Sequence, residues 1–376
     1  MVDTTVLEKN FWLVLSNIIL ILIIWLSFID AKRKPHVIKP KVKKNIGITC
    51  IFVFFLFAFW GSDWFHVAEF YPQLRAGQAT HMENIYVWIA QNLATNYIVF
   101  RIIVWGACLL LIKLLFDRIE VQKDLLWLMF AIFGVVWCSY ARVSLAMCLM
   151  YYGFAVLFKP YKHKYFSYII AILAIGASYF CHKTALFGII LIMLATLVRK
   201  FNRNTIVIML FSLPIIFILL KHFLSNYIFL DAIGENEMLD KTIVSAQGYL
   251  DSEKSIVGIG ALLLKILERS AYILTGIISV FMVVKNKNID RNPVINAFLR
   301  LDIFMVFISC LFLFNIGVNT SIIAERFFRF LFIPTGILIA YFWQIRYRMK
   351  LTRICYVLAI LYSSYALLYS LYMFII

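Results

Sequence analysis

The chain has 376 residues, of which 64% are hydrophobic and 15% are charged, and its formal net charge is +17. Soluble domains carry about 25% charged residues, so this composition excludes a soluble globular protein and indicates a polytopic membrane protein. Hydrocarbon offers backbone groups no hydrogen-bond partner, and the apolar runs lack strand-like alternation. We therefore expect an all-α fold, organised as one polytopic membrane domain over residues 1–376.

A membrane-crossing helix needs about 20 apolar residues, and by that length the chain holds about twelve transmembrane helices. The predicted spans are 10–29, 45–60, 96–116, 125–138, 142–158, 166–181, 184–198, 205–220, 262–284, 298–316, 322–343 and 354–375.

Basic residues set the expected orientation. They concentrate in the loop after the first span and in alternate short loops from there, and positive loops stay cytoplasmic. This distribution places both termini outside and makes the first apolar run a retained anchor. It also accounts for the net charge without a nucleic-acid partner.

Two outer segments are longer than turns. Residues 61–95 are expected to form an outer loop with an interfacial helix, because Ile85, Trp88 and Ile89 recur at helical spacing. Residues 221–257 are rich in Asp and Glu, and we interpret them as an outer loop that forms a cap or lid.

Arginines near the predicted outer face are candidates for binding a lipid-linked diphosphate. Arg326 and Arg329 share one helix face, and Arg142 begins another span. Forked guanidinium donors suit phosphate oxygens, and Lys183 would add a further cation. The alternative is that these side chains only snorkel to lipid headgroups.

His182, at the outer end of a span, is the leading candidate for a general base, because imidazole can accept a proton near neutral pH. Asp63 and Glu83 are outer carboxylates that could serve as base or bind sugar hydroxyls. A buried structural histidine and ordinary solvated carboxylates are the competing interpretations.

Aromatic residues of the outer loop could stack on sugar rings, although aromatic belts are common at membrane interfaces. The candidates are Trp64, Tyr86 and Trp88. The sequence shows no carboxylate cluster typical of a divalent ion, so we expect neither a metal nor a cofactor.

Four short patterns carry a resemblance to a known family. They are Glu83 with Tyr86, Arg142-Val143-Ser144-Leu145-Ala146, His182-Lys183-Thr184-Ala185-Leu186, and Arg326 entering the penultimate span. Together they resemble the EpsG family of Wzy-like polysaccharide polymerases. Val143 stands where that family typically has glutamine, and Asn84 stands where it has proline.

This resemblance implies a multi-pass protein of the bacterial inner (plasma) membrane. It would join oligosaccharide repeat units carried on undecaprenyl diphosphate, on the extracytoplasmic side, into an exopolysaccharide, capsule or O-antigen. Whether such an enzyme works alone or beside a flippase and a chain-length regulator stays open at the level of sequence. In this interpretation Arg142, Arg326 and Arg329 bind the diphosphate, and His182 is the base, with Asp63 or Glu83 as its substitute.

Two other functions stay open at the level of sequence. A transporter or flippase would bind the same lipid-linked sugar without covalent chemistry. A membrane O-acyltransferase would use His182 to activate a glycan hydroxyl.

Overall fold

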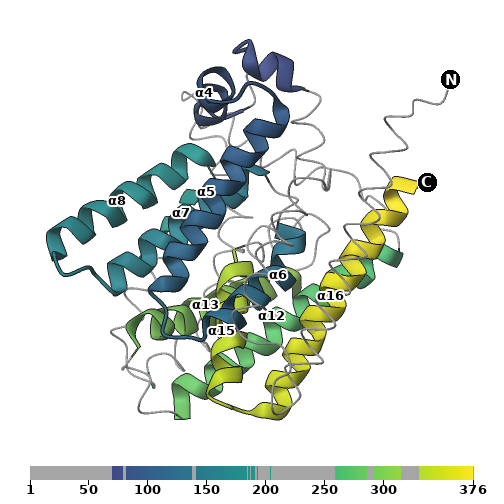
Figure 1. The fold of residues 1–376 in the computed structure, drawn as a ribbon. Helices are drawn as coiled ribbons and strands as arrows, with labels where there is room; N and C mark the ends of the chain where they lie inside the picture. The colour runs from purple at the N-terminus through teal and green to yellow at the C-terminus, as the bar shows by residue number, and fades with distance from the viewer. Residues whose placement is uncertain are drawn as a thin grey trace, which may run out of the picture.

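The computed structural model describes residues 70–78, 82–137, 141–183, 185–186, 188–190, 193, 204, 259–285, 292–314 and 330–375. Throughout these residues the regular structure is helical, which confirms the all-α prediction there (Figure 1). The helices are α4 (Asn84–Asn92), α5 (Tyr97–Asp117), α6 (Lys123–Trp137), α7 (Ala141–Phe158), α8 (Lys164–Cys181), α12 (Ile259–Lys285), α13 (Pro293–Phe314), α15 (Phe332–Gln344) and α16 (Met349–Ile375).

The helix ends follow from local chemistry. Asn96 caps α5, because its side-chain oxygen accepts a hydrogen bond from the backbone N–H of Val99. Asn292 caps α13 in the same way, and Pro293 fits the first helical position because no intrahelical donor is needed there. α8 ends where His182 turns to an extended conformation, with φ −165° and ψ 127°.

α7 and α8 form an antiparallel pair that packs beside α5 (Figure 1). They approach each other closely at Gly153, where an added Cβ would lie 2.9 Å from Cγ1 of Ile175 and 3.0 Å from the carbonyl oxygen of Ala171. Small residues at such a contact let two helix backbones approach each other, which is the usual packing mode of membrane helices. The close contact fixes α7 and α8 side by side along their length.

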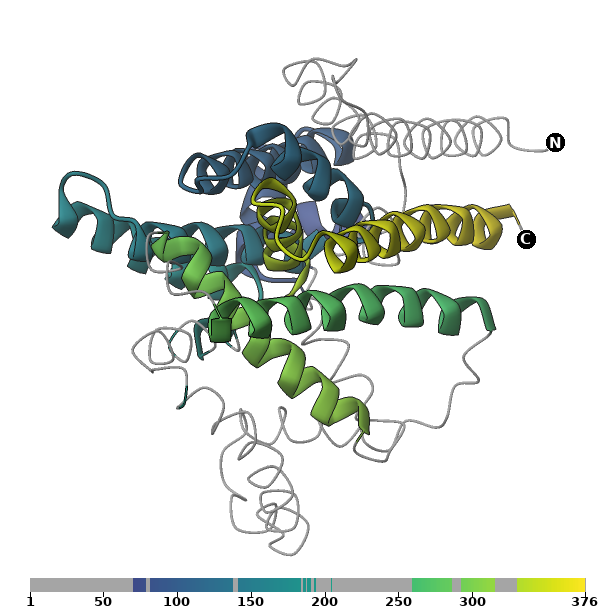
Figure 2. The same ribbon diagram turned by 90° about the horizontal axis from the view of Figure 1, so that it is seen from below.

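The remaining long helices pack into a second group. α12 lies along α16 and is crossed by α13, as seen from below in Figure 2. α6 packs on α15 and α16. Within this group Asp302 of α13 is fully buried and accepts a hydrogen bond of 3.0 Å from Ser279 of α12.

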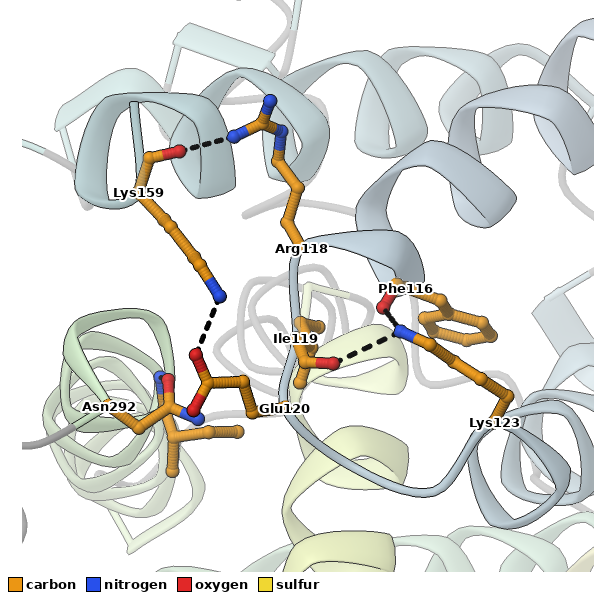
Figure 3. A network of polar contacts seen from close by, with 8 residues as sticks. Phe116, Arg118, Ile119, Glu120, Lys123, Lys159 and Asn292 are labelled. Atoms are coloured by element: carbon orange, nitrogen blue, oxygen red, sulfur yellow. Dashed lines mark hydrogen bonds and ion pairs between the residues drawn. The ribbon is translucent and has the colours of Figure 1, made fainter. Parts of the chain in front are cut away.

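The loops at one end of the bundle are joined by polar contacts (Figure 3). Arg118 donates to the backbone carbonyl of Lys159, and the Lys159 ammonium lies 2.6 Å from the Glu120 carboxylate. The Gln122 backbone N–H donates to the Gln344 side chain at 2.7 Å. These residues belong to three predicted inner loops, 117–124, 159–165 and 344–353. Their convergence at one end fits the predicted alternation of spans.

Two described helices, Tyr97–Asp117 and Lys164–Cys181, are long and apolar enough to cross a membrane. Three further apolar stretches are shorter: Val143–Phe158, Arg269–Val284 and Phe332–Gln344. α8 also exposes a row of apolar side chains, among them Ile169, Ile172 and Phe180, as a lipid-facing helix would. The count of twelve spans stays a prediction, and spans 10–29, 45–60 and 205–220 lie outside the described residues, as does the segment 221–257.

Candidate functional site

The predicted outer segment contains a helix, α4, with Glu83 at its N-cap position. Its buried stripe is Tyr86, Ile89 and Ala90, which faces the protein, whereas Trp88 is 52% exposed. A helix lies in this segment, but of the three residues whose spacing predicted it only Ile89 is buried. Its position in the membrane interface stays a prediction.

Glu83 and His182 meet at the end of the bundle opposite the loop contacts of Figure 3. The Nδ1 atom of His182 lies 2.8 Å from Oε1 of Glu83, although the two residues are 99 positions apart in the sequence. The His182 side chain is 18% exposed and that of Glu83 is 15% exposed. Because α4 packs on α8, the fold brings two separately predicted base candidates into one pair.

The pairing fixes what the imidazole can do. An ionised carboxylate only accepts hydrogen bonds, so opposite an ionised Glu83 the Nδ1 atom of His182 is the donor. In the neutral ring Nε2 then holds the lone pair and can accept a proton from a substrate hydroxyl. A cationic ring would be stabilised by the adjacent carboxylate. The contact thus suits Glu83 to orient the His182 ring.

Arg142 lies in the first turn of α7, and His182 follows the last turn of α8. Since the two helices are antiparallel neighbours, the start of α7 and the end of α8 lie at the same end of the bundle. Lys183 is exposed directly beside His182. The structure thus places four predicted site residues at the same end of the bundle: Glu83, Arg142, His182 and Lys183.

Of the other predicted sugar- and diphosphate-binding residues, only some lie in the part of the chain that the structure describes. Tyr86 is 1% exposed and packs edge-on against Phe100, so its ring serves the core here, and a sugar-binding role for it stays a prediction. The remaining candidates lie outside the described residues: Asp63, Trp64, Arg326, Arg329 and the Arg142 side chain.

Two charged residues that are buried in the described part of the chain were not singled out by the sequence analysis. Arg101, one turn into α5, is 3% exposed and lies over the ring of Tyr97, with 5.9 Å between the guanidinium carbon and the ring centroid. Asp302 is fully buried in α13. A charged residue inside a predicted span was the available signal for both. Among the described residues no group of three or more His, Cys, Asp or Glu is placed to hold a metal ion.

Comparison with known proteins gives one finding. The model of the EpsG family matches residues 43–375, which is most of the chain. Curated proteins and solved structures give no match. The match includes the helices that carry Glu83, Arg142 and His182. The chain therefore belongs to the EpsG family, a membrane protein family associated with the polymerisation of exopolysaccharides.

Proposed function

We propose that this protein is a polymerase that joins oligosaccharide repeat units carried on undecaprenyl diphosphate, at the extracytoplasmic face of a bacterial inner (plasma) membrane. The observation that carries the proposal is the Glu83–His182 pair, with its 2.8 Å contact at the end of the bundle where α7 begins. Glycosyl transfer to a hydroxyl needs a base for the acceptor proton, and this pair supplies one.

In the proposed reaction the acceptor hydroxyl oxygen forms a bond to the anomeric carbon of the donor glycan. The bond from that carbon to the diphosphate oxygen breaks, and the diphosphate leaves on its lipid. The hydroxyl proton passes to Nε2 of His182, while Glu83 holds the opposite ring nitrogen.

The leaving diphosphate gains negative charge as its bond breaks, so cations near it lower the barrier. We assign Arg142, Arg326 and Arg329 to this role, with Lys183 in support. Guanidinium groups can bind two phosphate oxygens at once, which favours arginine over lysine at such a site. A flippase would deliver the donor, and a chain-length regulator would set the extent of reaction.

The test is the product profile of purified protein in nanodiscs supplied with the native lipid-diphosphate oligosaccharide. We expect wild type to form a ladder spaced by whole repeat units, and His182→Ala and Arg142→Ala to lose it. His163→Ala and Arg353→Ala are matched controls, because both residues are exposed and lie near the other end of the bundle.

The outcomes separate the alternatives. Transfer of the lipid-linked sugar between leaflets without a ladder would favour a transporter. Acyl groups on the glycan would favour an O-acyltransferase. A ladder that survives both site substitutions would keep the polymerase and discard the assigned residues.

A further inference from the structure

A surface pocket lies at the end of α4 remote from Glu83. Its volume is about 550 Å³, within the range of ligand-binding pockets. Its lining comes from the helical turn before α4 and from the start of α5: Tyr71, Pro72, Arg75, Ala76, Thr95, Asn96 and Tyr97. Neither the diphosphate site nor the Glu83–His182 pair uses these residues.

The pocket wall is held in place by contacts between Tyr71 and residues that follow α4 in the chain. The Tyr71 hydroxyl donates to the carbonyl of Ala94 at 3.2 Å. The Tyr71 ring packs on Tyr97 with 5.9 Å between centroids, and it also packs on Phe100 at 5.7 Å. Phe100 in turn contacts Tyr86 of α4, with 6.4 Å between centroids. The pocket and the helix that carries Glu83 therefore form one packed unit.

Tyr71 stays a hydrogen-bond donor in this wall. Burial raises the pKa of its phenol above the usual value, although the nearby Arg75 charge acts in the opposite direction. The hydroxyl therefore keeps its proton at neutral pH and its hydrogen bond to Ala94.

Arg75 gives the pocket its charge. Its Nη1 atom donates to the carbonyl of Thr95 at 2.9 Å, which holds the guanidinium against another residue of the pocket lining. A guanidinium has five N–H donors, and the hydrogen bond to Thr95 uses one of those on Nη1. A second guanidinium, that of Arg101, lies over the ring of the lining residue Tyr97. Among the described residues that line the pocket none carries a carboxylate, so the pocket favours an anionic group.

The distance from this pocket to the paired base is set by α4. The helix has nine residues, and at 1.5 Å per residue its ends lie about 13 Å apart. His182 contacts the residue at its N-terminal end, and Thr95 follows its C-terminal end. One sugar ring is too short to reach from one site to the other, whereas an oligosaccharide of several rings can.

We infer that the Arg75 pocket is an acceptor subsite that binds an acidic sugar of the incoming repeat unit, while a hydroxyl of another sugar of that unit lies at His182. The inference rests on the proposed polymerase function. It would let the enzyme recognise the acceptor by the spacing between its acidic sugar and its reacting hydroxyl.

The binding test uses glucuronate, glucose and inorganic phosphate as probes of the full-length protein in phosphatidylcholine nanodiscs, followed by NMR titration. We expect glucuronate to bind more tightly than glucose, and Arg75→Gln to weaken glucuronate at least about tenfold. Arg353→Gln, an exposed arginine of α16, should leave the affinity unchanged. Ala76→Phe, which fills the pocket and keeps Arg75, should also weaken binding.

Equal glucuronate affinity in wild type and Arg75→Gln would overturn the inference. So would phosphate binding at Arg75 that glucuronate fails to displace, because that result assigns the pocket to a phosphate group and not to an acidic sugar.

A polymerisation assay tests the role in catalysis. Arg75→Gln should raise the KM for the acceptor about tenfold with little change in kcat and the same ladder spacing. If wild type forms a ladder and Arg75→Gln leaves KM unchanged, the acceptor subsite fails and the polymerase stands. If wild type forms no ladder, the polymerase proposal itself fails, whatever the probes show.

Discussion

Removing the members of the Glu83–His182 pair singly and together tests whether they act as one unit. General-base catalysis contributes about 10²- to 10⁴-fold, so His182→Ala should raise the barrier by about 2.7–5.5 kcal/mol. A hydrogen bond to a charged group is worth about 1.5–3 kcal/mol, and the 2.8 Å contact is mostly shielded from solvent. Glu83→Ala should therefore slow the reaction about ten- to hundredfold.

The double variant carries the decisive result. We expect Glu83 to act only through His182. The variant that carries both Glu83→Ala and His182→Ala should therefore have the same reaction rate as His182→Ala alone. The assay is the initial rate of ladder formation in nanodiscs, with His163→Ala as the control. If the two single losses multiply in the double variant, the residues act independently and the reasoning from their contact is refuted.

Three further experiments test the packing and the cation site. Gly153→Ala should lower the free energy of unfolding by about 1–3 kcal/mol, because the new Cβ would press on α8. At Gly106 a new Cβ meets no described atom within 4 Å, so Gly106→Ala should raise the free energy of unfolding by up to about 1 kcal/mol. Thermal unfolding in detergent measures both, and equal Tm values would contradict the assigned α7–α8 contact. Ser279→Ala and Asp302→Ala in a double-mutant cycle should show a coupling of about 0.6 kcal/mol, and zero coupling would exclude a stabilising hydrogen bond. Arg142→Lys should lose most polymerase activity and stay folded, because an ammonium lacks the fork; near-normal polymer length would reject Arg142 as the diphosphate ligand.

The sequence by itself determined the fold class and most helix positions. Apolar runs of membrane-spanning length force a helical backbone, because hydrocarbon leaves N–H and C=O groups no other partner. The predicted spans 96–116, 142–158 and 166–181 correspond to α5, α7 and α8 to within two residues at each end. Successive membrane spans alternate in direction, and this alternation also indicated that Arg142 and His182 lie at the same end of the bundle. Helix ends and loop charges are local properties, and local sequence specifies them.

Only the tertiary structure decided which candidates meet. Glu83 and His182 were both predicted as bases, and neither periodicity nor charge indicates that residues 99 positions apart touch. Their contact depends on how α4 packs on α8. Tyr86 also packs α4 against Phe100 of α5. The Arg75 pocket likewise exists only because the turn before α4 packs against the start of α5. Side-chain packing between helices sets these positions, and that information is distributed over the whole chain.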